Sequence, residues 1–166
     1  SLPSYVWWVQ DLARGQGGII TVHGVLPVPL AAGVYTNTAF ISATDDLLAA
    51  NNTAVITYTV PNVEPVFTSL PVITTTKTAP YTYTITAQDD NGDTLTISAS
   101  TLPAWLTLTD HGNGTATLTG TPANAEVGNH AVVLSVTDSG GLTTTQSFLI
   151  TVWGRVYLPL LFRNTP

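Results

Sequence analysis

The chain has 166 residues, enough for one large or two small domains, and 44% of them are hydrophobic while only 8% are charged. Ten acidic residues stand against four cations, Arg14, Lys77, Arg155 and Arg163, which gives a net charge of −6. Four scattered cations do not form a basic face, so the charge argues against nucleic acid and anionic membrane surfaces as partners. The absence of cysteine excludes disulfides and thiol chemistry.

The first 61 residues contain four segments typical of β-strands, separated by turns rich in glycine, proline and asparagine. The predicted strands are residues 5–9, 18–25, 34–41 and 53–60. In the last of them Ile56 and Tyr58 share one apolar face, and such a face needs a cover. Four strands make one sheet, so this part of the chain is short of a complete sandwich.

Three motifs in this part resemble the C-terminal half of a conserved-repeat β-sandwich domain of bacterial surface proteins. They are Trp8 with Asp11-Leu-Ala-Arg-Gly15, then Thr36-Asn-Thr-Ala39, and Asn51-Asn-Thr-Ala54 before a strand. The resemblance covers about residues 6–60 and lacks the usual first strands of that family. It implies that residues 1–61 are a partial module, completed upstream in a parent protein or by some other cover.

A short linker, Pro61-Asn-Val-Glu-Pro65, precedes a second module at residues 62–152. Its two prolines predict a semi-rigid connection. Short alternating segments separated by Gly, Pro and Asn turns predict a β-sandwich of seven strands. The predicted strands are residues 66–70 continuing into 72–76, then 81–88, 94–99, 105–109, 115–119, 129–137 and 143–152.

The second module resembles the immunoglobulin-like, dystroglycan-type cadherin-like family over its whole length. The motifs that carry this resemblance are Pro65-x-Phe67, Asp89-Asp-Asn-Gly-Asp93, Leu102-Pro-Ala-Trp-Leu106, Leu118-Thr-Gly-Thr-Pro122 and Val136-Thr-Asp-Ser-Gly140. The resemblance implies an all-β, Ig/cadherin-like fold. It also implies calcium at a domain junction, held most directly by Asp89, Asn91, Asp93 and Asp138.

Acidic residues gather where the predicted strands turn. Residues 89–93 hold three of the ten acidic residues, and strand direction puts this tip beside the turns at 110–114 and 138–141 and beside Glu64 of the linker. Calcium takes about six to eight oxygen ligands from carboxylates, carbonyls and amides. We therefore expect a calcium site made by Asp89, Asn91, Asp93, Asp138 and Glu64. The alternative left open is that hairpin turns simply require Asp, Asn and Gly.

The sequence offers no catalytic arrangement, and we expect the protein not to be an enzyme. His23, His111 and His130 are far apart and show no zinc-binding spacing. Carboxylates on exposed turns have nothing to raise their pKa, which acid catalysis of glycoside hydrolysis would require.

Two apolar features predict contacts with other molecules. Trp105 is expected to fill the core of the second module, whereas Trp7 and Trp8 point to opposite faces of one strand, so one of them is a candidate for contact with carbohydrate or protein. The tail at residues 153–166 is apolar, and we expect it to dock on the first module or on a neighbouring chain. A homodimer through the incomplete module and the tail is one form of this expectation.

Together these features predict a non-catalytic structural or adhesion module of a bacterial surface or secreted protein, exported from the cell. Its partners would be other protein domains or chains, with calcium as a cofactor at the junction. The alternative is a carbohydrate-binding accessory module of a secreted enzyme. The sequence has no run of about 18 apolar residues, so we expect no direct membrane insertion.

Overall fold

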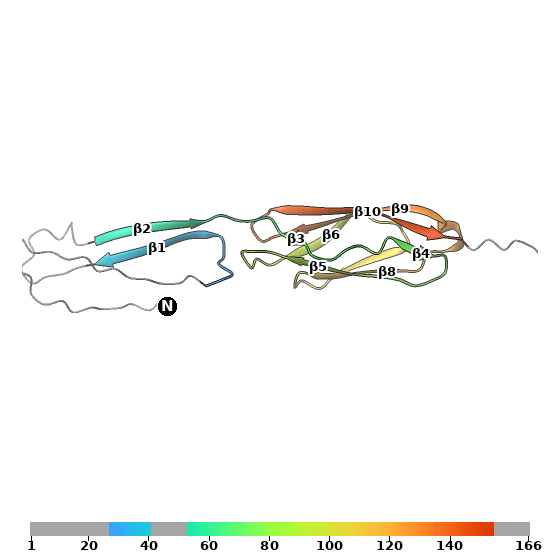
Figure 1. Ribbon diagram of the computed structural model, residues 1–166, viewed down its shortest axis with the longest axis horizontal. Helices are drawn as coiled ribbons and strands as arrows, with labels where there is room; N and C mark the ends of the chain where they lie inside the picture. The colour runs from blue at the N-terminus through green and yellow to red at the C-terminus, as the bar shows by residue number, and fades with distance from the viewer. Residues whose placement is uncertain (1–26, 41–52, 155–166) are drawn as a thin grey trace, which may run out of the picture.

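The computed structural model describes residues 27–40 and 53–154, and β-strands dominate these residues (Figure 1). The predicted strands at 5–9 and 18–25, the pair Trp7 and Trp8, and the tail beyond Gly154 lie outside the described residues.

The two described strands before the linker form an antiparallel pair, β1 (Gly33–Phe40) and β2 (Thr53–Val60). Their bounds agree with the sequence prediction to within one residue. As alternation predicts, Ile56 and Tyr58 share a face, and they are 69% and 57% exposed.

After the linker, eight strands form two four-stranded sheets, in the orders β4-β10-β9-β6 and β3-β5-β8-β7. One short 3₁₀ turn, η2 (Asn124–Glu126), interrupts the series. The strands are β3 (Val66–Phe67), β4 (Thr74–Thr76), β5 (Tyr81–Gln88), β6 (Thr96–Thr101), β7 (Leu106–Asp110), β8 (Thr115–Gly120), β9 (Gly128–Thr137) and β10 (Thr143–Trp153). The all-β sandwich predicted from the alternating pattern is confirmed.

The core lies between the two sheets and consists of the residues that alternation turns inward. On β5 the buried positions are every second residue from Tyr81 to Ala87, and on β9 they are Val132, Leu134 and Val136. Trp105 is partly buried and packs against this core, edge-on to Tyr81 and to His130. This agrees with its predicted role as a core side chain.

The first predicted strand of the sandwich is divided between the two sheets. β3 pairs antiparallel with β5, and β4 pairs parallel with β10. Ser69 stabilises the segment in which the chain passes from one sheet to the other. Its Oγ lies 2.8 Å from the Tyr83 hydroxyl oxygen and accepts the Thr86 N–H at 2.9 Å. Gln146 of the opposite sheet joins this network through the same Tyr83 hydroxyl, which donates to Gln146 Oε1 at 2.9 Å.

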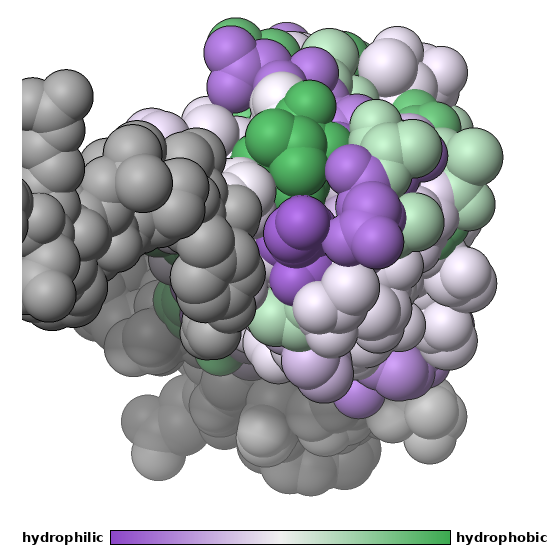
Figure 2. Space-filling view, turned by 90° about the vertical axis from the view of Figure 1, so that its right-hand side faces the viewer, coloured by the Kyte–Doolittle hydropathy of each residue, from purple (hydrophilic) through white to green (hydrophobic). Residues whose placement is uncertain are grey.

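The two ends of the sandwich differ in charge. Figure 2 faces one end, where hydrophilic and hydrophobic residues lie side by side. The turn of Lys77 follows β4, and the Lys77 backbone N–H donates to the Trp153 carbonyl at the end of β10. The other end, where the linker from β2 enters, carries the acidic turns (Figure 1). This second end is where a functional site is expected.

Tyr81 offers a test of the core. Its hydroxyl donates to the Val72 carbonyl oxygen at 2.6 Å, and burial together with the neighbouring Tyr83 raises the pKa of Tyr81 to about 12. A phenol in the unfolded chain has a pKa of about 10. The folded state therefore keeps the full contribution of neutral Tyr81 below pH 10 and loses it as the pH rises to about 12.

We expect Tyr81→Phe to lower the free energy of unfolding by about 1 kcal/mol at pH 8, because it removes a hydrogen bond. The difference from the wild type should shrink by pH 11, and urea unfolding at both pH values measures it. Tyr58→Phe, which removes an exposed hydroxyl, should keep the wild-type pH profile. An equal deficit of Tyr81→Phe at both pH values would contradict the linkage.

Candidate metal centre

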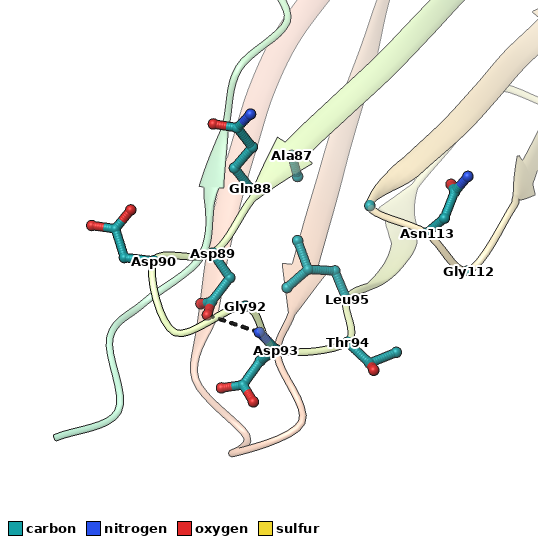
Figure 3. A pocket seen from close by; sticks show the side chains of 11 residues that line it. Ala87, Gln88, Asp89, Asp90, Gly92, Asp93, Thr94, Leu95, Gly112 and Asn113 are labelled. Carbon is teal, nitrogen blue, oxygen red and sulfur yellow. Dashed lines mark hydrogen bonds between the residues drawn. The ribbon is translucent and has the colours of Figure 1, made fainter. Parts of the chain in front are cut away.

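The acidic tip between β5 and β6 is a tight turn built around Asp89. Asp89 Oδ1 accepts the backbone N–H groups of Asn91 at 2.9 Å and Asp93 at 3.2 Å, and its carbonyl accepts the Gly92 N–H at 3.1 Å. Gly92 has a φ of 76°, which suits glycine. As a result the carboxylates of Asp89 and Asp93 lie on one side of the tip, while Asp90 points away (Figure 3).

The third carboxylate belongs to Asp138 in the turn between β9 and β10. Asp138 is only 6% exposed. Its Oδ1 accepts the Leu142 N–H at 2.8 Å, and its Oδ2 accepts Nδ2 of Asn62 at 2.9 Å. The next residue, Ser139, donates its hydroxyl to Asp93 Oδ1 at 2.8 Å, which joins this turn to the acidic tip.

Asp89, Asp93 and Asp138 therefore form one group, and each offers a carboxylate oxygen within 4.8 Å of the other two. Three carboxylates this close repel one another. Lys77 is the one lysine or arginine in the described part of the chain. It directly follows β4 and bonds to the last residue of β10, and both strands end away from the linker (Figure 1). No described basic side chain therefore offsets the charge, whereas a divalent cation would.

Two buried oxygen atoms test whether a cation fits here. Asp89 Oδ2 and Asn62 Oδ1 are buried and have no hydrogen-bond partner. Buried polar atoms are nearly always paired, with protein, with water or with an ion. A hard cation prefers carboxylate and carbonyl oxygens, so the donor set at this end of the sandwich fits calcium.

The structure brings together three of the five residues that the sequence predicted as ligands. Glu64 is exposed on the linker and does not belong to the group. Asn91 is adjacent to two of its members, but its amide is engaged with the linker. Asp110, predicted to lie at the same end, uses its two carboxylate oxygens for the N–H groups of Ile97 and Gly112 instead.

Asn91 connects the linker and the segment before β1 to the acidic tip. It is 6% exposed, and its Oδ1 accepts the Val63 N–H at 2.8 Å. Its Nδ2 lies 3.1 Å from the Leu30 carbonyl oxygen and 3.3 Å from that of Pro61. A Cβ atom added at Gly92 would lie 2.9 Å from Pro29 Cγ, so the backbone approaches closely there. The linker and the segment before β1 thus contact the tip that carries two of the three carboxylates.

A shallow pocket lies on the outer side of the tip, between it and the turn after β7. Asp89, Asp93 and Asn113 line it together with backbone of Gly112 and Gly114 (Figure 3). Two of the three acidic residues of the group, Asp89 and Asp93, thus belong to the lining of this pocket.

The sequence did not lead us to Asn62, whose amide contacts Asp138 and so lies next to the three carboxylates. The available signal was its position in the short linker between Pro61 and Pro65, at the same end as the acidic turns.

Replacing Asn91 tests whether its side chain keeps the linker in place. Asn91→Ala removes the acceptor of the Val63 N–H, and a hydrogen bond contributes about 1 kcal/mol net. We expect the Val63 amide to exchange with solvent about fivefold faster, measured by NMR hydrogen exchange at pH 7 in the presence of a chelator. Gln88→Ala, which removes an exposed amide at the end of β5, is the matched control. Unchanged exchange at Val63 in the Asn91 variant would contradict this role.

The chain is similar to one protein family and to several solved structures. One family model, described as "Putative Ig domain", matches residues 64–153. No curated protein matches the chain. An endo-fucoidan hydrolase of glycoside hydrolase family 107 is similar in structure, with 26% identity, a TM-score of 0.48 and coverage of 79% of this chain and 20% of that one. The SrpA adhesin from Streptococcus sanguinis is similar at 16% identity and a TM-score of 0.48, with coverage of 57% and 59%.

This chain therefore spans about a fifth of the hydrolase and less than two thirds of the adhesin. The family model covers more than half of the chain, and the chain belongs to the "Putative Ig domain" family.

Proposed function

We propose that this chain is a non-catalytic structural or adhesion segment of an exported bacterial protein, stiffened by calcium where the linker enters the Ig-like domain. The observation that carries the proposal is the group of Asp89, Asp93 and Asp138, whose oxygens lie within 4.8 Å of one another. The group joins two turns that are far apart in the sequence, and it lies at the end of the domain that receives the linker.

A calcium ion would supply the positive charge that this end lacks. Asp89 and Asp93 would hold it from the acidic tip and Asp138 from the β9–β10 turn. The hydrogen bonds from Asn91 N–H, Asp93 N–H and Leu142 N–H hold Oδ1 of Asp89 and Oδ1 of Asp138. The ion would bind the second oxygen of each, of which Asp89 Oδ2 has no hydrogen-bond partner and Asp138 Oδ2 accepts the Asn62 amide. Because Asn91 connects the same tip to Val63 and Pro61, ordering the tip would also order the linker.

A non-catalytic role is supported by what surrounds the carboxylates. Proton transfer needs an acid or base within hydrogen-bond reach. In the described ranges, His111 is hydrogen-bonded to Thr117, and His130 to the Glu126 carbonyl, so neither ring is at the group. Instead the oxygens of the group accept backbone and side-chain hydrogen bonds, as structural turns do.

A surface or secreted location is supported by the Ig-like family model that matches residues 64–153. Among the residues that the structure describes, no helix has the length and hydropathy needed to cross a membrane.

The carbohydrate-binding alternative needs exposed aromatic rings side by side on one sheet. The large exposed aromatic side chains of the described residues are Phe40, Tyr58 and Trp153. Phe40 and Tyr58 lie on opposite faces of the β1–β2 pair, and Trp153 is on β10. Tyr35 lies directly opposite Tyr58, but it is half-buried and its hydroxyl donates to the Ala31 carbonyl oxygen at 2.8 Å. The described residues therefore offer one pair of neighbouring rings with a single exposed member, which favours the structural role.

Thermal melting in calcium and in chelator tests the proposal. A ligand present at a hundred times its dissociation constant adds about 2.7 kcal/mol of stability, so we expect millimolar calcium to raise the melting temperature by several degrees. Asp93→Asn should abolish the shift. In chelator the same variant should melt no lower than the wild type, because it removes charge repulsion and keeps an acceptor for Ser139.

Asp90→Asn is the matched control, since Asp90 is on the same tip but points away from the group (Figure 3). It should keep the full calcium shift. A wild type that melts at the same temperature in millimolar calcium and in chelator would rule out the proposed role of calcium.

A further inference from the structure

We infer that Asn113 is a site of spontaneous deamidation promoted by Thr115, and that the contact with the linker protects the same dipeptide at Asn91 from this reaction. The chain contains two Asn-Gly dipeptides, Asn91-Gly92 and Asn113-Gly114. Asparagine before glycine is prone to deamidation, because glycine has no Cβ atom to shield its backbone nitrogen. The inference does not depend on the proposed calcium ion.

The reaction at Asn113 needs only water. The backbone nitrogen of Gly114 gives its proton to hydroxide and attacks Asn113 Cγ, so that a C–N bond forms. The bond from Cγ to Nδ2 then breaks, and ammonia leaves with a proton taken from water. Water opens the resulting succinimide at one of its two imide bonds. The product is aspartate or isoaspartate at position 113, and nothing is oxidised or reduced.

The first observation is that both reacting groups at Asn113 are free. Asn113 is exposed in the turn between β7 and β8. Its Nδ2, which becomes the leaving group, and the Gly114 N–H have no hydrogen-bond partner in the described part of the chain. The Gly114 carbonyl accepts the Ala87 N–H at 2.8 Å and so keeps the turn in place. Ring closure at Asn113 therefore breaks no hydrogen bond of the nucleophile or the leaving group.

The second observation is a pair of donors on the Asn113 carbonyl oxygen. Asn113 Oδ1 accepts the Thr115 N–H at 3.2 Å and the Thr115 hydroxyl at 2.6 Å. Attack at Cγ moves negative charge onto this oxygen, and hydrogen bonds to a charged acceptor are about twice as strong as those to a neutral one. Both donors therefore stabilise the transition state more than the starting amide.

The third observation is that the other dipeptide is engaged at the same atoms. Asn91 is 6% exposed, and its Oδ1 also has a donor, the Val63 N–H at 2.8 Å. Its Nδ2, however, lies 3.1 Å from the Leu30 carbonyl oxygen, and the Gly92 N–H donates to the Asp89 carbonyl at 3.1 Å. Deamidation at Asn91 must first break both of these bonds. The contact with the preceding segment thus protects the residue that makes it.

The product would change the wall of the shallow pocket. Asn113 lines this pocket together with Asp89 and Asp93, so a carboxylate at position 113 adds negative charge there. Isoaspartate also lengthens the main chain beside Gly114 by one methylene group. Deamidation at Asn113 is therefore a slow and irreversible change to this face of the domain.

The experiment is incubation of the full chain at pH 9, in native buffer and in urea, followed over time by peptide mass spectrometry. In urea the two dipeptides should react at similar rates. In native buffer we expect Asn113 to react at least about tenfold faster than Asn91. The reason is that each of the two bonds broken at Asn91 reduces the reactive population about fivefold.

Thr115→Val tests the promoting hydroxyl, because it keeps the side-chain shape and the backbone N–H. We expect deamidation at Asn113 to slow about fivefold, the effect of one lost hydrogen bond, while the rate at Asn91 is unchanged. Thr115→Ser, which keeps the hydroxyl, should react as the wild type does. Asn113→Gln should remove the acidic product at this position, because a glutamine side chain closes the ring far more slowly.

An Asn113 that stays intact in native buffer while the unfolded chain reacts would overturn the inference. Equal rates at Asn91 and Asn113 in native buffer would overturn the protection of Asn91. A Thr115→Val variant that reacts as fast as the wild type, or faster, would overturn the role of Thr115.

Discussion

Electrostatic repulsion among Asp89, Asp93 and Asp138 is the main physical constraint at the end of the sandwich that receives the linker. Backbone N–H groups and the hydroxyl of Ser139 hold these carboxylates close together. Hydrogen bonds to carboxylates are strong, but they do not neutralise three charges. The sandwich core, which begins at Ala87, Leu95 and Val136 beside this group, folds on hydrophobic burial and so can bear the repulsion. We propose that a calcium ion supplies the positive charge that this group lacks.

The connection to the preceding segment is built on the same tip. Asn91 lies between two of the carboxylates in the sequence and turns its amide to the linker. Asn62 does the reverse, since it belongs to the linker and turns its amide to Asp138. These reciprocal contacts make the order of the tip and the order of the linker depend on each other. That coupling suits a module whose task is to hold neighbouring parts of a protein in a fixed arrangement.

Much of the fold could be predicted from the sequence, because exposed threonine alternates with buried apolar residues. Strand β5 agrees with its predicted bounds, and Val132, Leu134 and Val136 are buried as predicted. The division of the first strand between two sheets was not predicted. It depends on Ser69, Tyr83 and Gln146, which are distant in sequence.

The candidate site was predicted in part. Strand direction brought Asp138 to the acidic tip, since direction alone decides which turns share an end of a sandwich. It could not show where each polar side chain would point. Asn91 faces the linker, Glu64 faces solvent, and the half-buried Asn62 turns its amide to Asp138. These orientations follow from the path of the linker over the tip, and that path is a tertiary property.

Whether calcium binds the acidic group and orders the linker is tested most directly by an NMR titration of the ¹⁵N-labelled chain with calcium, followed at each backbone amide. We expect the shifts to concentrate at residues 61–63, 89–93 and 138–142, and the Val63 amide to become better protected from exchange as the tip is ordered. Shifts confined to other parts of the chain, or none at millimolar calcium, would contradict this expectation.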